Sequence, residues 1–384
     1  MSVPGPAPLD HEFGGRVNQV VDKAVEEGRI VGAVILVARR GEILYDRAAG
    51  LADREARKAM TPDAIFRLAS VTKPVVATAA LALVETGVIG LDDPLAKFIP
   101  EFRPKLADGS EPAITIRQLL THSAGLDYRF RQAADGPYHR ADVSDGLDEP
   151  GLSMAENLRR IASVPLSCLP GTGWGYSVAM DVLGEAMATG TSLPELVDRL
   201  VVQPLGMHDA AFAVRDRSRL GTPYADGPGK AVPMGEHHRV PFGDGFISYS
   251  PGRVFDPTSF ASGGTGMNGT ASDVLKLLEA LRSDGAPVIR PETAAAMTKD
   301  AIPDLETTMP GWGWGLGFGV LRDPLAASTP QTAGTWRWGG VYGHSWFVDP
   351  ALGLTVVALT NTAIAGMTGA FPDALRDAVY GRQA

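Results

Sequence analysis

The chain has 384 residues, of which 45% are hydrophobic, and it carries a formal net charge of −9 at pH 7. This length suffices for one large domain or two closely packed ones, and the apolar fraction is typical of a globular core. No basic patch stands out, so a nucleic-acid-binding protein is not indicated, and no span of about 18 apolar residues could cross a bilayer.

The numbers of cysteine and histidine residues indicate the cellular compartment of the protein and whether it could bind a metal. Cys168 is the single cysteine, which excludes an internal disulfide, fits a reducing compartment and leaves no thiolate pair for zinc. The seven histidines form no H-E-x-x-H motif. Residues 1–14 have no basic start followed by an apolar stretch, so they do not resemble a secretory signal. We therefore expect a cytoplasmic protein that needs no metal and no cofactor.

The first part of the chain predicts a helix, two strands and a second helix. One face of residues 17–27 is apolar, which is typical of an amphipathic helix. Residues 32–39 and 42–50 have the composition of strands joined by a tight turn. Residues 33–38 are apolar without alternation, so we expect the first strand to lie in the centre of a sheet. Residues 70–86, rich in Ala, Leu and Val, predict a buried helix.

The middle of the chain is mixed, and its end returns to strands. Predicted helices cover residues 116–122, 154–164, 179–189 and 193–202. Long Gly- and Pro-rich loops at 129–151 and 221–252 lie between these segments, and loops of that length in a compact domain commonly form the walls of a site. Predicted strands cover residues 315–322, 335–339, 344–348 and 354–361, before a closing helix at 368–380.

Strands at both ends with helices between them predict one sheet built from the two ends of the chain. We expect residues 1–95 and 258–384 to form this sheet-containing domain. Residues 96–257 form an inserted, mainly helical region with long loops.

The sequence Ser70-Val71-Thr72-Lys73 opens the buried helix and is the first candidate for chemistry. A serine hydroxyl needs a nearby base to become a nucleophile, and residues three apart share a helix face. Burial and the positive helix end both favour a neutral Lys73, which could then take the proton of Ser70. The same spacing also arises from a Ser cap followed by a surface Lys, so the neighbouring motifs decide between the two.

Several further segments match one family in order along residues 30–362. They are residues 66–73 before an Ala-rich helix, residues 119–126 (L-L-T-H-S-A-G-L), Pro170-Gly171 with residues 174–178 (W-G-Y-S-V), residues 204–207 (P-L-G-M), Gly263-Gly264 with residues 270–273 (T-A-S-D), and residues 338–340 (W-G-G). The chain resembles the serine β-lactamase and penicillin-binding superfamily, most closely the class C β-lactamase-like esterases known as family VIII carboxylesterases. The resemblance implies an α+β fold with an antiparallel sheet flanked by helices.

The resemblance also implies a role for Tyr176, which occupies the tyrosine position of the Y-x-N element. In these enzymes that tyrosine lies beside the Ser and Lys as a phenolate or proton shuttle. A phenol with a pKa of about 10 is protonated at neutral pH, so a phenolate would need a nearby Lys73 cation. Lys73 and Tyr176 then form a coupled pair whose proton the sequence does not assign. The plain alternative is a half-buried core tyrosine.

Two departures from the β-lactamase pattern bear on the substrate. Trp338-Gly339-Gly340 stands where K-T-G or H-T-G is usual, which replaces a cation by an apolar wall with one N–H donor. Val178 stands where Y-x-N has Asn, and it offers no hydrogen bond to a substrate amide. Both changes disfavour an anionic, amide-bearing ligand, because each unpaired buried polar group costs about 1–3 kcal/mol. The W-G-G sequence is also what the esterase subfamily shows.

An oxyanion formed during acyl transfer needs backbone N–H donors. By resemblance these come from Ser70 and from Val341, while Gly339 and Gly340 let a substrate approach the strand closely. Tyr128 is our further candidate for substrate binding. Other aromatic candidates for the pocket, for which core packing is at least as good an explanation, are Phe130, Tyr138, Trp174, Phe246, Trp312, Trp314 and Trp346.

Two other nucleophile arrangements receive no support. No G-x-S-x-G sequence occurs, so the nucleophile elbow of an α/β-hydrolase is not indicated. His344-Ser345 would place the two side chains on opposite sides of a strand, and we expect His344 near the wall of the site.

The expected function is hydrolysis of short-chain carboxylic esters through an acyl-enzyme on Ser70, with a small-molecule ester as the partner. The alternatives are a β-lactamase or D-amino-acid peptidase, an acyltransferase on the same machinery, and a sensor that stays acylated. The sequence leaves the natural ester and the oligomeric state open.

Overall fold

The computed structural model describes residues 9–10 and 12–382. Most of the segment that we compared with a secretory signal, residues 1–8 and 11, lies outside the described residues. Within them, no helix combines the length and apolar character that crossing a membrane would require.

One eight-stranded sheet organises the molecule, in the order β10-β11-β12-β13-β14-β1-β2-β3. Its strands are β1 (Gly32–Arg39), β2 (Glu42–Asp53), β3 (Lys58–Ala59), β10 (Trp312–Trp314), β11 (Gly319–Leu321), β12 (Trp336–Gly340), β13 (His344–Asp349) and β14 (Leu354–Thr360). Every neighbouring pair is antiparallel, and β1 joins the two ends of the chain by pairing with both β2 and β14. The predicted α+β fold with an antiparallel sheet is confirmed.

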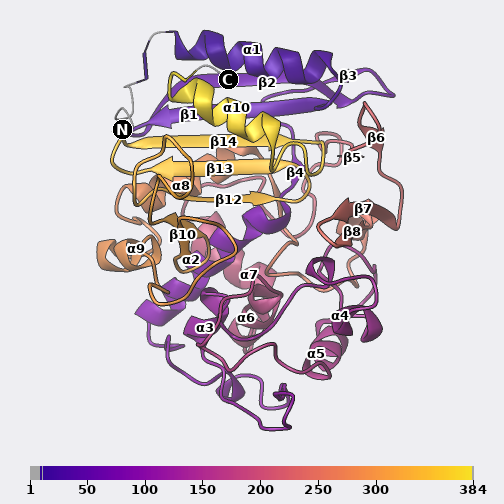
Figure 1. The fold of residues 1–384 in the computed structure, drawn as a ribbon, viewed down its shortest axis with the longest axis vertical. Helices are drawn as coiled ribbons and strands as arrows, with labels where there is room; N and C mark the ends of the chain where they lie inside the picture. Colours follow the sequence, from indigo (N-terminus) through magenta and orange to yellow (C-terminus); the bar gives the residue numbers. More distant parts are fainter. Residues whose placement is uncertain (1–8, 11, 383–384) are drawn as a thin grey trace.

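The apolar run in β1 is explained by helices on both faces of the sheet. Ala33, Ile35 and Val37 pack in a cluster with helices α1 (Phe13–Glu26) and α10 (Ala370–Val379). Val34, Leu36 and Ala38 belong to the main core on the opposite face. Figure 1 shows α1 and α10 together along the sheet at the top of the view. A strand whose successive side chains are all buried carries no polar alternation.

The main core contains the helix that follows Ser70. Helix α2 (Thr72–Glu85) is buried from Thr72 to Leu83, and α8 (Ala271–Arg282) packs against β14 and β1. A capping box between Thr270 and Asp273 begins α8. The sequence T-A-S-D therefore carried a helix-start signal, although we did not predict this helix.

The lower part of Figure 1 is mainly helical. Its helices are α3 (Ile116–Leu120), α4 (Pro137–Arg140), α5 (Met154–Ala162), α6 (Ala179–Met187) and α7 (Leu193–Val197), which a π-helical turn (Asp198–Val202) continues. All strands of the large sheet come from residues 32–59 and 312–360. The division at residues 95 and 258 stays a prediction.

Other elements differ from the sequence expectations. The loop predicted at 221–252 contains two short hairpins, β5 (Tyr224–Ala225) with β6 (Val232–Pro233) and β7 (His238–Phe242) with β8 (Gly245–Tyr249). Besides α8, we missed α9 (Pro291–Met297) and the short pair β4 (Phe66–Arg67) with β9 (Asn268–Gly269). A two-residue strand has too little alternation to be read from sequence.

Candidate active site

Ser70 lies on a tight turn between β4 and α2. The turn is a 3-10 helix, Ala69–Val71, and the pairing of β4 with β9 fixes its start. Ala69 has a φ of 45°, in the left-handed region that non-glycine residues rarely adopt. Such local strain persists where surrounding contacts hold it, and it is frequent at functional sites. The hydroxyl of Ser70 is thereby held at the start of the helix, with Ser70 only 5% exposed.

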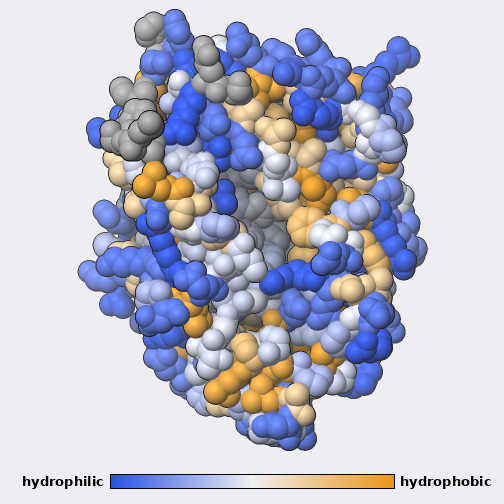
Figure 2. Space-filling view, viewed as in Figure 1, coloured by the Kyte–Doolittle hydropathy of each residue, from blue (hydrophilic) through white to orange (hydrophobic). Residues whose placement is uncertain are grey.

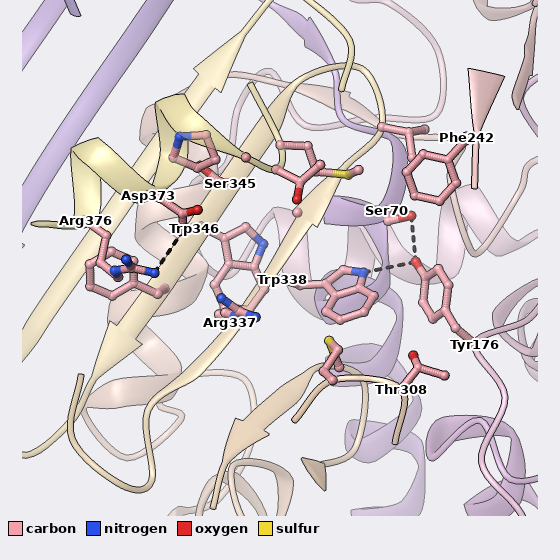
Figure 3. Close-up of a pocket in the computed structure, with 18 of the residues that line it drawn as sticks. Ser70, Tyr176, Phe242, Thr308, Arg337, Trp338, Ser345, Trp346, Asp373 and Arg376 are labelled. Carbon is pink, nitrogen blue, oxygen red and sulfur yellow. Dashed lines mark hydrogen bonds and ion pairs between the residues drawn. The ribbon is translucent and has the colours of Figure 1, made fainter. Parts of the chain in front are cut away.

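A chain of hydrogen bonds joins four of the residues singled out in the sequence. Lys73 Nζ donates to Ser70 Oγ at 3.0 Å, and the hydroxyl of Tyr176 donates to the same oxygen at 2.7 Å. The indole N–H of Trp338 donates to the Tyr176 hydroxyl at 3.0 Å. Figure 3 shows the last two contacts as dashed lines between strand β12 and the nucleophile helix. Ser70 therefore has two proton-carrying groups within hydrogen-bond distance.

Lys73 is fully buried, and burial dominates its titration. Loss of hydration lowers the pKa of Lys73 to about 7, although the carboxylates of Asp181 and Asp145 oppose this effect. Nζ also donates to the carbonyl oxygen of Gly264 at 2.9 Å, so its position is fixed by two acceptors. A lysine with such a pKa exists in both protonation states near neutral pH. It can accept a proton and return it.

Tyr176 is held in its neutral form. Burial raises the pKa of Tyr176 above its usual value, while the hydrogen bonds with Ser70 and Trp338 oppose the shift. The backbone around it is fixed, because Arg131 donates to the Tyr176 carbonyl oxygen at 2.9 Å and His122 Nδ1 accepts from the Ser177 N–H at 3.2 Å. The ring of His122 also packs against that of Tyr176, with centroids 4.8 Å apart. Because its pKa is raised, Tyr176 is protonated at neutral pH. This favours a role as a phenol that relays protons, and it disfavours a permanent phenolate.

A cavity of about 440 Å³ opens beside this network. Figure 2, viewed from the same side as Figure 1, shows a hollow near the centre of the molecular surface. Ser70, Tyr176, Trp338, Gly339 and Val341 all line the cavity. Of the further aromatic candidates, Phe130, Trp174 and Trp346 reach its wall, and Phe242 adds an apolar side chain next to Ser70.

Two of the residues assigned to substrate binding lie behind the wall. Tyr128 and Val178 are fully buried and are absent from the cavity lining. The Tyr128 ring lies 5.3 Å from Lys73 Nζ and 5.1 Å from the Tyr176 ring, so it contacts the catalytic candidates from inside the core. Val178 is the first residue before α6 and belongs to the main core. The argument that Val178 removes a substrate contact therefore has no support in this geometry.

The two glycines of W-G-G permit close packing of β12. A Cβ added to Gly340 would lie 2.4 Å from the Leu68 carbonyl oxygen, which belongs to the segment leading to Ser70. A Cβ on Gly339 would lie 2.5 Å from the His344 carbonyl oxygen on the neighbouring strand. Gly339 lines the cavity, whereas Gly340 is buried between β12 and the nucleophile turn. Both glycines are thus required by the protein's own backbone, and the close approach of a substrate to this strand stays a prediction.

The N–H groups of Ser70 and Val341 are available for an oxyanion. Within residues 9–10 and 12–382, neither N–H makes a hydrogen bond, and both residues line the cavity. The hydroxyl of Tyr249 donates to the Val341 carbonyl oxygen at 2.8 Å, which fixes the orientation of this peptide segment. Tyr249 was not recognised in the sequence, because its contact with Val341 joins segments 92 residues apart.

Asp181 and Ser262 also escaped the sequence analysis. One carboxylate oxygen of Asp181 accepts from Ser262 Oγ at 2.5 Å and from the Gly264 N–H at 3.2 Å. Burial raises the pKa of Asp181, while the hydrogen bond from Ser262 and the charge of Lys73 oppose the shift. A lone Asp within the apolar helix 179–189 was the signal that could have identified it. Asp181 thus helps to position Gly264, whose carbonyl oxygen accepts from Lys73.

The part of the cavity beyond Trp338 carries charged side chains. Figure 3 shows Asp373 and Arg376 at the end away from Ser70, with Arg337 between them and Trp338. Arg376 pairs with Asp373 and Asp377, whereas the Arg337 guanidinium stacks on Trp312 at 3.9 Å and makes no hydrogen bond or ion pair with any residue that the structure describes. His344, which we expected near the wall, is fully buried and bonds through Nε2 to the Arg67 carbonyl oxygen at 2.8 Å. Burial lowers the pKa of His344 to about 4.

Comparison with known families agrees with this arrangement. The sequence model described as Beta-lactamase matches residues 17–379. The chain belongs to the β-lactamase family. The predicted resemblance is therefore confirmed.

Within the β-lactamase family, the chain is similar to several esterases and acyl-transferring enzymes. The chain is 54% identical over 377 residues to "Esterase EstB" of Burkholderia gladioli, with 96% of each chain covered. A solved structure, "EstCE1, a hydrolase with promiscuous acyltransferase activity", has a TM-score of 0.92 at 44% identity and covers 96% of this chain and 99% of its own. The simvastatin synthase of Aspergillus terreus, at 22% identity and a TM-score of 0.75 over 97% of this chain and 99% of its own, shares the fold. The assignment to serine hydrolases is confirmed.

Proposed function

We propose that the chain hydrolyses short-chain carboxylic esters through a covalent acyl-enzyme on Ser70. The observation that carries this proposal is the bonding of Ser70 Oγ to both Lys73 and Tyr176 at the edge of an apolar cavity. The likeness to an esterase at 54% identity supports the same reaction class.

In the first half of the reaction, neutral Lys73 takes the proton of Ser70 while Oγ attacks the ester carbonyl carbon. The N–H groups of Ser70 and Val341 stabilise the negative charge on the former carbonyl oxygen. When the C–O bond breaks, Tyr176 donates its proton to the departing alcohol and Lys73 returns a proton to Tyr176. The alcohol leaves and Ser70 carries the acyl group.

In the second half, water attacks the acyl-enzyme. Neutral Lys73 takes one proton of the attacking water, and the Lys73 ammonium returns that proton through the Tyr176 hydroxyl to Ser70 Oγ as the acid departs. The hydrogen bond from Trp338 keeps the Tyr176 oxygen in place throughout this cycle. No residue outside this network needs to change its protonation state.

The cavity supports an uncharged ester near Ser70. Trp338 and Phe242 present apolar surface there, and no cation takes the place of the usual lysine or histidine at residue 338. An ester needs fewer buried hydrogen bonds than an amide, because it lacks an N–H group to be satisfied.

The test is hydrolysis of p-nitrophenyl acetate and butyrate by the wild type and by Ser70→Ala. We expect the variant to lose at least about 10³-fold in kcat/KM, the order seen when a nucleophile is removed. Equal activity in both proteins would refute the proposal. Nitrocefin provides the comparison for β-lactamase activity, for which we expect much slower turnover.

Acyl transfer is a second candidate, favoured by the likeness to a hydrolase described as having promiscuous acyltransferase activity. An alcohol that binds the cavity would attack the acyl-enzyme in place of water. Product analysis with an added alcohol would separate the two, because transfer yields a new ester while the rate of p-nitrophenol release stays limited by acylation.

A further inference from the structure

A second cavity of about 360 Å³ lies behind the segment that carries Ser70. None of its lining residues lines the catalytic cavity. Its walls come from the 3-10 turn Pro251–Phe255, from residues 212–217 and from Arg67, which precedes Ser70 by three positions. Three arginines, Arg67, Arg217 and Arg253, face it.

Two of these arginines are buried, and among the described residues they hydrogen-bond only to carbonyl groups. Arg67 and Arg253 are each 8% exposed. Arg67 donates to the carbonyl oxygens of Pro251 at 3.1 Å and Gly221 at 3.0 Å, and Arg253 donates to that of Phe260 at 2.7 Å. Nε of Arg253 is buried with no partner among the described residues. Each guanidinium has five N–H donors, so several remain unused.

The third arginine, Arg217, lies at the mouth of the second cavity. Arg217 is exposed and stacks over the ring of Phe255 at 4.2 Å, and it forms no ion pair within the part of the chain that the structure describes. Phe255 is 37% exposed, so the guanidinium and the ring stand at the mouth of the cavity. Tyr342, which directly follows Val341, contributes a phenol whose pKa burial raises to about 12, so that it carries its proton at neutral pH.

The carboxylates of Asp148, Asp181 and Asp256 act on Arg253 from a distance, and that of Glu236 acts on Arg67, but among the described residues none forms an ion pair with either arginine. Asp256 lines the cavity, but its oxygens accept from Thr258 and Ser259. Asp148 is paired with Arg129, and Glu236 accepts from the Gly252 N–H at 2.8 Å. Burial lowers the pKa of Arg67 and Arg253, yet an arginine stays protonated in a protein. A buried cation without a direct ion-pair partner is unfavourable, so these two guanidinium groups favour the entry of an anion.

We infer that this cavity binds a phosphate-type oxyanion, either free or carried by a small molecule. Arg67, Arg217 and Arg253 supply charge and forked donors that match phosphate oxygens. Ser250 and Tyr342 offer hydroxyl groups on the same wall. The volume exceeds that of one phosphate, and Phe212 and Phe260 offer apolar surface to an organic part of the ligand. This site is separate from the proposed esterase chemistry and does not depend on it.

The test is calorimetric titration of the full-length protein with inorganic phosphate and with phenyl phosphate at constant ionic strength. We expect saturable binding of both, with phenyl phosphate tighter if the natural ligand carries an organic group and equal affinity if free phosphate is the ligand. Thermal unfolding gives a second readout, because a ligand of the folded state raises the midpoint as its concentration rises.

The decisive variant is Arg217→Gln, because Arg217 is exposed and we expect its loss to leave the fold intact. We expect the Kd for phosphate to rise by about tenfold or more, the usual consequence of losing a charge-assisted hydrogen bond. Arg253→Gln should abolish binding. Arg199→Gln, which removes an exposed arginine from the π-helical turn (Asp198–Val202), is the matched control and should bind as the wild type does.

Two results would overturn the inference. One is the absence of saturable binding of either phosphate compound to the wild type. The other is equal affinity in the wild type, Arg217→Gln and Arg199→Gln, which would place any bound anion elsewhere on the molecule.

Discussion

The two cavities show two ways in which this molecule handles a buried cation. Beside the catalytic cavity the buried cation is Lys73, and burial lowers its pKa to about 7. In the second cavity the cations are Arg67 and Arg253, which cannot lose their protons at any ordinary pH. A lysine relieves the cost of burial by giving up its proton, and the free base is what the chemistry uses. An arginine keeps its charge and needs an anion.

The sharpest test of this contrast exchanges the two residue types at the catalytic position. Lys73→Arg should lower kcat/KM for p-nitrophenyl butyrate by about 10³-fold, within the range of general-base effects, because a guanidinium cannot accept the Ser70 proton. Steady-state kinetics with circular dichroism measures this loss against retained folding. Lys97→Arg, at an exposed ion pair with Asp93, is the control and should change nothing.

The pH dependence of kcat/KM tests the protonation state directly. Lys73 must be neutral to act, so activity should fall about tenfold for each pH unit below its pKa of about 7 and level off above it. Asp181 raises the pKa of Lys73, so Asp181→Asn should shift the rising limb to lower pH. A profile that is flat from pH 5 to 8 would contradict the role of Lys73 as the base.

Arg337 tests whether the catalytic cavity also holds an arginine that selects anions. It has no ion-pair partner among the residues described, and it lies in the cavity between Trp338 and the Asp373–Arg376 pair. Arg337→Gln should reduce kcat/KM for p-nitrophenyl esters of dicarboxylic acids by about tenfold, through loss of one charge-assisted contact. Neutral esters of the same length should be hydrolysed at the wild-type rate. Equal effects on both substrates would show that Arg337 acts through structure alone.

Of the variants considered, Trp338→Phe should cause the smallest loss of catalytic activity. The variant keeps the apolar wall and loses the N–H that bonds to Tyr176, so kcat should fall by a few-fold to about tenfold, as for one neutral hydrogen bond. Trp174→Phe is the matched control, because Trp174 lines the same cavity and its buried indole N–H has no partner among the described residues. An equal loss of kcat in the two variants would show that the hydrogen bond from Trp338 to Tyr176 has no specific role in catalysis.

Local sequence information was sufficient for the nucleophile helix and the main strands. Strand β1 matches its predicted bounds of 32–39, and residues 70–86 correspond to the Ser70 turn followed by α2. These segments have a single dominant pattern, an unbroken apolar run or a helix with no polar face. Ser70, Lys73, Tyr176 and Trp338 were found because the family motifs mark them in order.

Long-range contacts account for what sequence reasoning missed. The second cavity brings together residues 67, 217 and 253, and no periodicity links them. Val178 and Tyr128 were assigned to the substrate, but tertiary packing buries both. Asp181 and Tyr249 act through partners about 80 to 90 residues away in the chain. The cytoplasmic location stays a prediction that rests on Cys168 and the first residues.

The most direct test of the central claim is mass spectrometry of the protein quenched during turnover of p-nitrophenyl butyrate, followed by peptide mapping. The account predicts one butyryl group on the peptide that contains Ser70 in the wild type, and none in Ser70→Ala or Lys73→Arg. A butyryl group on another residue, or turnover by Ser70→Ala at the wild-type rate, would contradict it.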